Sequence, residues 1–407
     1  MDYKRINTNK KGVMINMYGR TSWLPPGGTN LFQDIKDEIA LAKRRIIDMS
    51  IGEPSLPPLE IARITAAREL LSSDVKTHGY QDNKTPALLN FAELFALFHM
   101  DPQLEGRSDV KFLGTPGTKS MLGVIIRACG EELKLVGTHT NPGYPTPAVQ
   151  CGYQGIQHYA LKTNPENDFR FSVADIKEGT ELLMLNYPHN PSGQVATKEF
   201  WEEICAYCEK NGIRLVNDAA YTGLVHYSKD HCTLADVAVN YPNLSWVELY
   251  TASKLINVTG WRIGAMVGSP DFIDDIATIK GNTDSGLSAP LAAGVLDAVK
   301  YDQTGIATNK NLYRVRLQFL IRILENQGMQ LAVRPSAGFF TLWKVPKMAF
   351  GKTITRAEEF NDRMIRLGIV GVPFDGDDSY IRYAVVNDII PLENDIISAF
   401  EKAKVSY

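Results

Sequence analysis

Between about residue 105 and residue 270, short apolar runs alternate with amphipathic segments, and this alternation constrains the fold more than any other feature. The runs are short and apolar, as buried parallel strands are, and they comprise Val110–Leu113, Leu133–Gly137, Leu182–Leu185, Ile213–Val216, Val247–Tyr250 and Gly264–Val267. Segments with helical spacing, such as Ser120–Ala128 and Lys198–Asn211, lie between several of them. Strand–helix alternation at this spacing predicts an α/β fold whose mostly parallel sheet is covered on both faces.

The last third of the chain predicts a second, smaller α+β domain. A long helical region follows Pro290, with one face marked by Leu312, Val315, Phe319 and Ile323 and a stop at Gly328. Beyond it we expect strands at Phe339–Trp343 and Tyr380–Val385, and helices near Arg356–Leu367 and Leu392–Lys404. A chain of 407 residues is long enough for two joined domains. We therefore divide it into an N-terminal arm with part of the small domain (1–60), a large domain (61–300) and a small C-terminal domain (301–407).

Composition narrows the possible environments and partners. The net charge of −3 gives no electrostatic footprint for nucleic acid or an anionic membrane. No apolar stretch approaches the ~20 residues that span a bilayer, and the N-terminus lacks the apolar run of a secretory signal. Five cysteines do not make a disulfide framework in a chain of this length. We expect a cytoplasmic protein that binds neither nucleic acid nor membrane.

Two features invite a metal or redox interpretation. Cys205 and Cys208 form a C-x-x-C spacing, but with Trp201 and Ile204 they repeat at helical spacing, which favours core packing. No second cysteine pair follows at a zinc-like distance, and the histidines are scattered. We assign no metal.

Chemically distinctive residues follow three of the predicted strands, where ligands bind in open α/β sheets. Asn190 lies in a Pro- and Gly-rich loop after the third run, Asp218 and Tyr221 follow the fourth, and Lys254 and Arg262 follow the fifth. Taken singly, each has an ordinary interpretation as a turn residue, a helix cap or a surface charge. Together they match the needs of pyridoxal phosphate: a lysine, an acid at the pyridine nitrogen, donors at the phenolic oxygen, and a cation for the phosphate.

The sequence resembles the fold type I pyridoxal phosphate enzymes, specifically the class I/II aminotransferase family related to aspartate aminotransferase. The resemblance runs from Gly52 to Arg382, and its most specific part is an S-K-x-x-x-x-x-G-x-R-x-G pattern met by Ser253, Lys254, Gly260, Arg262 and Gly264. It implies a large cofactor-binding domain with a mostly parallel seven-stranded sheet and a smaller α+β domain. It also implies pyridoxal 5'-phosphate as the cofactor.

The resemblance gives each residue around the cofactor ring a role. Lys254 would carry the cofactor as a Schiff base and then move a proton between the substrate Cα and the cofactor, which requires a depressed pKa. Asp218 would pair with the pyridine nitrogen, and Asn190 and Tyr221 would hydrogen-bond the phenolic oxygen. Tyr144, in a Pro-Gly-Tyr-Pro turn, would stack on the ring; the alternative is a turn aromatic in the core.

The resemblance likewise assigns contacts to the cofactor phosphate. They would come from a cation, from hydroxyl groups and from the turn that opens a helix, namely Arg262, Thr251, Ser253, Gly117, Thr118 and Lys119. Tyr80 resembles the tyrosine that reaches the phosphate of a neighbouring subunit, which implies a homodimer with shared active sites. Ser288 is a further candidate contact from the partner.

Substrate recognition is implied at three positions. Arg382 would bind the substrate carboxylate, because a planar guanidinium matches a carboxylate bidentately. The alternative is a salt bridge on a surface strand, since Asp375, Asp377 and Asp378 are close in sequence. The backbone of Gly52 would approach the same carboxylate, and Asn190 would complete the site.

The expected reaction is transfer of an amino group from an L-amino acid to a 2-oxo acid in a ping-pong cycle with a pyridoxamine intermediate. The alternative on the same fold is a lyase or cyclase, for example a C–S lyase that performs β- or γ-elimination. Such enzymes keep the same lysine, aspartate and arginines, because substrate positioning decides which bond breaks at Cα. Lys119 is compatible with an acidic substrate and equally with a solvated surface lysine.

Overall fold

The computed structural model describes residues 6–8, 14–16, 39, 45–81, 90–100, 104–227 and 230–407. Most of the N-terminal arm predicted for residues 1–60 lies outside these ranges. Within it, β1 (Ile6–Thr8) and β2 (Met14–Asn16) form a two-stranded antiparallel pair.

A seven-stranded sheet forms the centre of the larger part of the molecule, in the order β4-β10-β9-β8-β7-β5-β6. Its strands are β4 (Lys111–Thr115), β5 (Leu135–Thr138), β6 (Gln157–Ala160), β7 (Leu182–Leu185), β8 (Arg214–Asp218), β9 (Trp246–Thr251) and β10 (Gly264–Gly268). β10 runs antiparallel to both of its neighbours, β4 and β9, and the other strand pairs of this sheet are parallel. The prediction of a mostly parallel sheet is therefore confirmed, and all six predicted runs lie on strands. The missed strand, β6, is an edge strand in which only Tyr159 is buried, so it has no apolar run.

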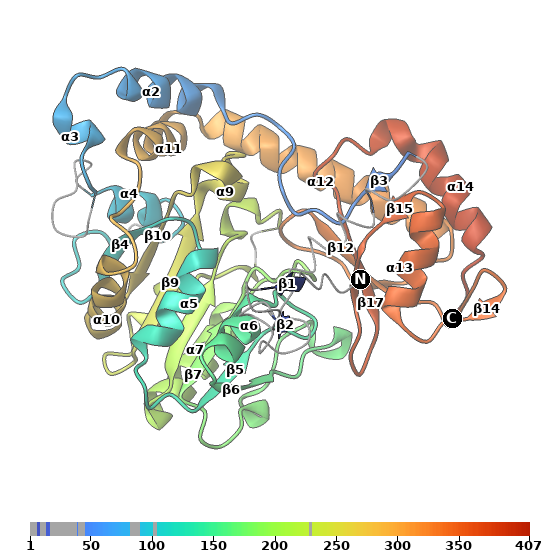
Figure 1. Cartoon of the computed structure of the whole chain (residues 1–407), viewed down its shortest axis with the longest axis horizontal. Helices are drawn as coiled ribbons and strands as arrows, with labels where there is room; N and C mark the ends of the chain where they lie inside the picture. The colour runs from blue at the N-terminus through green and yellow to red at the C-terminus, as the bar shows by residue number, and fades with distance from the viewer. Residues whose placement is uncertain are drawn as a thin grey trace.

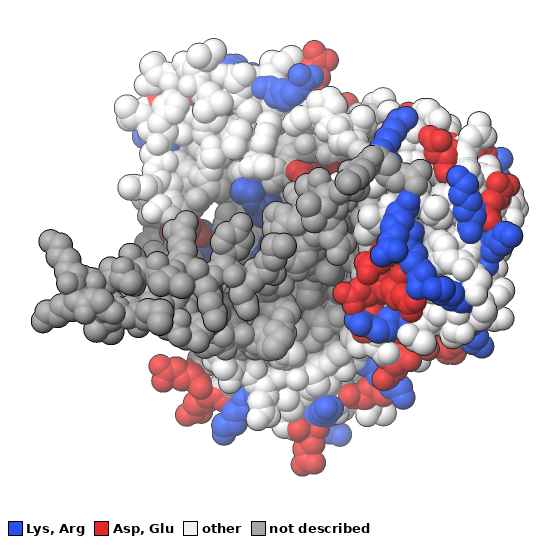
Figure 2. Space-filling view, turned by 45° about the vertical axis from the view of Figure 1, so that its right-hand side comes forward, with Lys and Arg blue, Asp and Glu red and all other residues white. Residues whose placement is uncertain are grey.

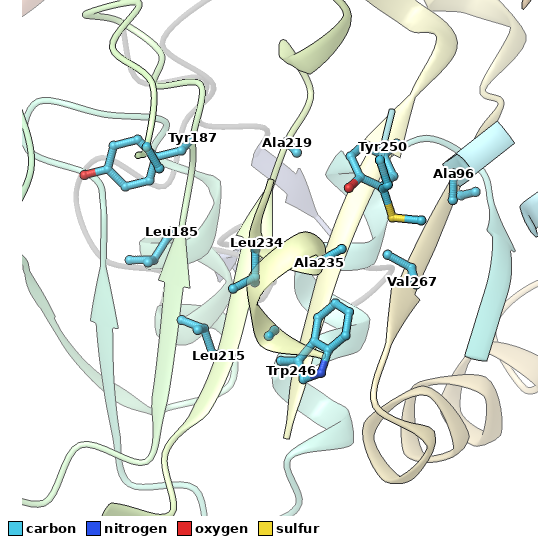
Figure 3. Packing of buried hydrophobic residues seen from close by; sticks show 14 of the residues in the cluster. Ala96, Leu185, Tyr187, Leu215, Ala219, Leu234, Ala235, Trp246, Tyr250 and Val267 are labelled. Carbon is cyan, nitrogen blue, oxygen red and sulfur yellow. The ribbon is translucent and has the colours of Figure 1, made fainter. Parts of the chain in front are cut away.

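Helices cover both faces of this sheet (Figure 1). One face packs against α4 (Phe91–Leu97), α7 (Lys198–Asn211), α8 (Leu234–Ala238) and α11 (Ala289–Tyr301). The other packs against α5 (Lys119–Ala128), α6 (Thr146–Tyr153) and α10 (Pro270–Gly281). Figure 3 shows part of the apolar core between the sheet and the first of these two groups of helices, where Leu215 and Trp246 lie beside Leu234 of α8. The sheet is thus buried on both sides, and its polar groups are concentrated at the strand ends.

Local sequence signals explain where the helices begin and end. In α7 the Thr197 hydroxyl accepts a hydrogen bond from the Phe200 amide, and Gly212 ends the helix with φ +65. Cys205 and Cys208 of the same helix are fully buried in the core, which confirms that they serve packing. The remaining helices of this part are α2 (Glu60–Leu70), α3 (Val75–His78) and α9 (Ala252–Leu255).

A smaller antiparallel sheet in the order β11-β12-β17-β16 forms the C-terminal part. It consists of β11 (Leu331–Val333), β12 (Phe340–Lys344), β16 (Val372–Phe374) and β17 (Tyr380–Ala384), and it packs with α12 (Gln303–Asn326), α13 (Ala357–Arg366) and α14 (Glu393–Ala403). Two further pairs join β13 (Met348–Ala349) to β14 (Lys352–Thr353), and β3 (Ile47–Asp48) to β15 (Ile369–Val370). Short 3-10 turns lie at Pro165–Asn167, Val173–Asp175, Thr222–Leu224, Thr259–Trp261 and Ile390–Leu392. The predicted smaller α+β unit is confirmed.

The predicted buried face of α12 is wrong in part. Val315 is 40% exposed, whereas Tyr313, Leu317 and Leu320 point into the core. Apolar residues occupy more than one stripe of this helix, so helical periodicity alone does not select the face that meets the sheet.

The surface carries charges of both signs. Figure 2 shows Lys and Arg lying among Asp and Glu over the C-terminal part on the side it presents. In the part of the chain that the structure describes, no helix has the length and apolar character to cross a bilayer.

Candidate active site

The functional candidates meet in a cavity of ≈ 420 Å³. Strands β7, β8 and β9 end at it, the segment after β3 passes over it, and β12 and β17 contribute from the smaller sheet. Its lining includes the following predicted site residues: Gly52, Thr118, Lys119, Tyr144, Asn190, Asp218, Tyr221, Thr251, Ser253, Lys254, Arg262 and Arg382. Residues far apart in sequence therefore converge at the carboxyl edge of the sheet, as the strand-end rule predicts.

Lys254 lies in α9, directly after β9, with its amine inside the cavity. Its Nζ donates a hydrogen bond to the carbonyl oxygen of Gly52 at 2.6 Å. Burial lowers the pKa of Lys254 to about 8, an effect that the Glu53 carboxylate opposes and the Arg262 guanidinium reinforces. The amine is therefore much closer to neutrality at physiological pH than a surface lysine is.

Asp218 ends β8 and is buried, with 6% of its surface exposed. Its Oδ1 has no hydrogen-bond partner among the described residues. Burial raises the pKa of Asp218 to about 6, although hydrogen bonds from the Thr118 side chain and the Ala220 backbone work in the opposite direction. A buried carboxylate oxygen without a partner is costly in isolation, which indicates a place for a positively charged or N–H-bearing ligand group.

Arg382 projects from β17 into the same cavity. Only 1% of its surface is exposed, so the alternative of a surface salt bridge is wrong. Its Nη1 donates to Asn190 Oδ1 at 2.9 Å, its Nη2 donates to the Ser50 carbonyl, and its guanidinium carbon lies 4.2 Å from the centroid of the Phe340 ring. Burial lowers the pKa of Arg382 to about 10, but the group remains a cation at neutral pH.

Asn190 is held by the strand ends on either side of it. The backbone N–H of Asn190 donates to Asn186 Oδ1 at 2.9 Å, and Asn186 Nδ2 donates to the backbone carbonyl oxygen of Asp218 at 2.6 Å. These bonds connect the loop after β7 to the end of β8. Asn190 and Asp218, which the sequence placed on different loops, are therefore connected through the Asn186 side chain.

Arg262 connects the Lys254 segment to the turn before α5. Its Nη1 donates to the Thr259 carbonyl at 2.8 Å, and its Nη2 donates to the Pro116 carbonyl at 3.1 Å. Gly117 does not line the cavity, but a Cβ at this position would lie 2.4 Å from Arg262 Nη2, and its φ is +76. Glycine at this position leaves room for the guanidinium beside the start of α5.

One predicted site residue lies apart from the others. Tyr80 does not line the cavity, and 79% of its surface is exposed. The sequence interpretation also missed several lining residues, namely Ile51, Glu53, Asn186, Ala220, Thr259 and Phe340. Asn186 directly follows β7 and Ala220 is the second residue after β8, so the strand-end rule could have found them. Phe340 comes from β12, and no local signal connects it to the motifs.

Comparison with known proteins identifies the family of the chain. The family profile for aminotransferase class I and II matches residues 44–379. LL-diaminopimelate aminotransferase from Methanocaldococcus jannaschii is 30% identical over 350 residues, which cover 83% of this chain and 80% of that protein. The enzyme of the same name from Syntrophobacter fumaroxidans is 28% identical over 402 residues, covering 91% and 94%.

Solved structures of the same fold are also similar. Aspartate aminotransferase from Thermus thermophilus with maleate superposes with a TM-score of 0.79 at 20% identity, covering 96% of this chain and 99% of that one. The aromatic aminotransferase from Pyrococcus horikoshii has a TM-score of 0.77 at 19% identity, covering 90% and 98%. The chain belongs to the aminotransferase class I and II family and is a pyridoxal phosphate-dependent aminotransferase.

Proposed function

We propose that the cavity around Lys254 is where this aminotransferase moves the amino group of an L-amino acid to a 2-oxo acid. The observation that carries the proposal is the joint presence of a lysine amine with a lowered pKa, a buried carboxylate and two guanidinium groups in one cavity. Pyridoxal phosphate, when bound, supplies a conjugated ring that stabilises negative charge at the substrate Cα. The protein's task is then to hold that ring, orient the amino acid and move one proton.

The residues present fit this cofactor. Asp218 Oδ1 would accept a hydrogen bond from the protonated ring nitrogen, which gives the buried oxygen a partner and keeps Asp218 ionised. The phosphate would lie against the Arg262 guanidinium, the Ser253 hydroxyl and the start of α5 at Thr118 and Lys119, where helix N–H groups favour anions. Tyr144 and Tyr221 would border the ring, the first stacked on it.

Three residues would orient the amino acid for proton transfer. The Arg382 guanidinium would bind the α-carboxylate, with Asn190 holding it in place and the Gly52 backbone closing the site from above. A Cβ on Gly52 would meet the Phe340 ring at 2.9 Å, so glycine allows this close passage. Lys254 Nζ would then remove the proton from Cα, a role suited to an amine whose pKa is about 8.

For the substrate, we propose an amino acid with a charged group at its far end, with LL-diaminopimelate as the first candidate. Glu53 lines the cavity together with Lys119, which the family resemblance also assigns to the cofactor phosphate. They offer one cation and one anion, which match the carboxylate and ammonium of a second amino acid group. Relatives that are 25–30% identical over most of the chain carry the name LL-diaminopimelate aminotransferase, which supports the same choice.

The test is a donor panel assayed with 2-oxoglutarate as the acceptor. We expect the highest kcat/KM with LL-diaminopimelate, lower values with glutamate and aspartate, and little turnover with alanine or leucine. A preference for uncharged side chains would contradict the substrate proposal. Release of ammonia with a 2-oxo acid, without amino transfer to the acceptor, would favour the elimination alternative.

The described surface also supports a homodimer with shared active sites. Large apolar side chains of α2, α3 and the adjoining turns are exposed, namely Ile64, Leu70, Leu71, Val75 and Tyr80. An apolar patch of this extent on a protein surface usually marks an interface. A second copy seated on it would cover these side chains and would bring Tyr80 toward the partner's cavity.

Two further proposals concern the domain boundaries of the chain and the cellular compartment of the protein. We divide the chain at about residues 60 and 300, which is supported by the start of α12 at Gln303 and by separate apolar cores on the two sides. We place the protein in the cytoplasm, which is supported by cysteines that are all free thiols.

A further inference from the structure

A buried polar pair lies behind the candidate active site, on the sheet face that is otherwise apolar. Asn217 of β8 and Glu248 of β9 are direct neighbours across the two strands, and each has 1% of its surface exposed. Side chains alternate along a strand, so this pair shares a face with Leu215, Trp246 and Tyr250 of the apolar core. Burying a carboxylate there costs free energy that apolar residues would avoid, so the pair calls for a reason beyond packing.

Four hydrogen bonds hold the Glu248 carboxylate in one orientation. Oε1 accepts from Asn217 Nδ2 at 2.7 Å and from the Leu234 amide at 3.2 Å. Oε2 accepts from the Ala235 amide at 2.8 Å and from the Tyr250 hydroxyl at 2.8 Å. All four partners are donors, so both carboxylate oxygens are held by two hydrogen bonds each. In Figure 3, Ala235 lies next to the strand that carries Tyr250.

The Glu248 carboxylate in turn orients the side-chain amide of Asn217. This amide binds both the N–H and the carbonyl group of the Tyr187 backbone. Asn217 Oδ1 accepts from the Tyr187 amide at 2.8 Å, and Asn217 Nδ2 donates to the Tyr187 carbonyl at 2.9 Å. Tyr187 is the second residue after β7, at the start of the loop that carries Asn190. The direction in which that loop leaves the sheet is therefore set by Asn217 and Glu248.

We propose that Glu248 and Asn217 are positioning residues that place the Asn186–Asn190 loop, and through it the Asn190 contact with Arg382. This inference rests on the proposed function, because it concerns the placement of Asn190 beside the cofactor and the amino acid. The chain of contacts runs from Glu248 through Asn217 to the Tyr187 backbone, and from Asn190 Oδ1 to Arg382 Nη1 at 2.9 Å. Neither Glu248 nor Asn217 lines the cavity.

The test compares two variants that remove hydrogen bonds from the same carboxylate. Asn217→Leu removes the connection to the loop with little change in side-chain size. Tyr250→Phe removes the hydroxyl bond to Oε2 and leaves the Asn217 connection intact. Glu248→Gln, which preserves shape, is a milder variant in case Asn217→Leu does not fold. Each is measured for Tm, for the Kd of pyridoxal phosphate added to the apoprotein, and for KM and kcat with the best amino donor.

We expect Asn217→Leu to raise the donor KM and the cofactor Kd by on the order of tenfold, which a loss of about 1.4 kcal/mol at each contact would cause. Glu248→Gln should raise both by less. Tyr250→Phe should lower Tm while leaving KM and Kd at wild-type values. A Tm loss in Asn217→Leu or Glu248→Gln with unchanged KM and Kd would overturn the inference, as would the full binding defect in Tyr250→Phe. Wild-type protein that binds no cofactor would contradict the proposed function, and this inference with it.

Discussion

At the scale of single residues, burial moves the two central titratable groups toward their neutral forms. It lowers the pKa of Lys254 to about 8 and raises that of Asp218 to about 6. Burial thus shifts the two pKa values in opposite directions, because it penalises whichever form of each group is charged. Each group then suits its proposed role, since a neutral amine accepts a proton and a buried carboxylate without a partner favours a cationic ring nitrogen.

The buried carboxylate of Asp218 predicts a pH-dependent stability difference in the apoprotein. Its pKa is higher in the folded state, about 6, than its ordinary value of 3.8, so folding favours the protonated form. The stability that Asp218 contributes is complete below its ordinary pKa and is lost as the pH rises through 6. Asp218→Asn should therefore make the apoprotein more stable than wild type at pH 8, by as much as about 3 kcal/mol. This gain should shrink toward pH 4.

Urea unfolding of both apoproteins between pH 4 and pH 8 measures the difference. The same variant should lose on the order of 100-fold in kcat, because the ring nitrogen loses its anionic partner. Equal stability of the two proteins across the pH range would contradict the burial argument. Near-normal turnover would show that another residue pairs with the ring.

At the scale of elements, the site is built where strands end and the next segment turns away. The sequence was sufficient to place Asn190, Asp218 and Lys254 near these ends, because short apolar runs define the strands and these residues come within a few positions of each run. The motifs of the sequence indicated less about the residues that β12 and β17 contribute to the cavity. Arg382 was found through the family resemblance. Phe340 was missed, since its contact with Arg382 is made across the paired strands β12 and β17, and no local signal gives that pairing.

The turn between β4 and α5 offers an element-scale prediction with a matched control. Gly117 and Gly130 both have positive φ, +76 and +89, but a Cβ at Gly117 would meet Arg262 whereas one at Gly130 would meet nothing within 4 Å. Alanine at either position should cost about 1–2 kcal/mol of stability for the left-handed backbone. Only Gly117→Ala should also weaken cofactor binding, by on the order of tenfold, because it displaces the guanidinium proposed to hold the phosphate.

Titration of each apoprotein with pyridoxal phosphate, followed by visible absorbance, separates the two effects. A wild-type Kd in Gly117→Ala would mean that Arg262 does not hold the phosphate. An equal loss of affinity in Gly130→Ala would mean that backbone strain alone accounts for the change.

At the scale of the whole molecule, two features decided how far the sequence could predict the structure. The α/β alternation and the lysine motif led to the fold class, because each depends on local pattern. The edge strand β6 and the buried face of α12 were not predicted correctly, because they depend on which neighbours pack against them. Val315 illustrates this: it is apolar and at helical spacing, but it faces solvent.

The exposed apolar side chains of α2 and α3 predict a dimer that activity requires. Leu71 is 87% exposed and Val75 is 80% exposed, so a double Leu71→Glu/Val75→Glu change should be tolerated within one chain. It should convert the dimer to a monomer and lower turnover at least on the order of tenfold, because Tyr80 would no longer reach the partner's site. Ile390→Glu, at a 40% exposed position of the smaller part, is the control and should leave assembly unchanged.

Light scattering after size-exclusion chromatography gives the mass of each variant in solution. A wild-type protein that is monomeric and fully active would contradict the shared active site. A dimeric double variant would place the interface elsewhere on the surface.

Borohydride reduction identifies the lysine that bonds to the cofactor, which we propose is Lys254. The protein loaded with pyridoxal phosphate is reduced, digested and analysed by peptide mass spectrometry, with Lys119→Ala as a variant that keeps Lys254. We predict a pyridoxyl adduct on Lys254 in both proteins and no adduct when Lys254→Ala is treated in the same way. An adduct on another lysine, or reduction that leaves Lys254 unmodified, would mean that Lys254 does not carry the cofactor and that the proposed active site is wrong.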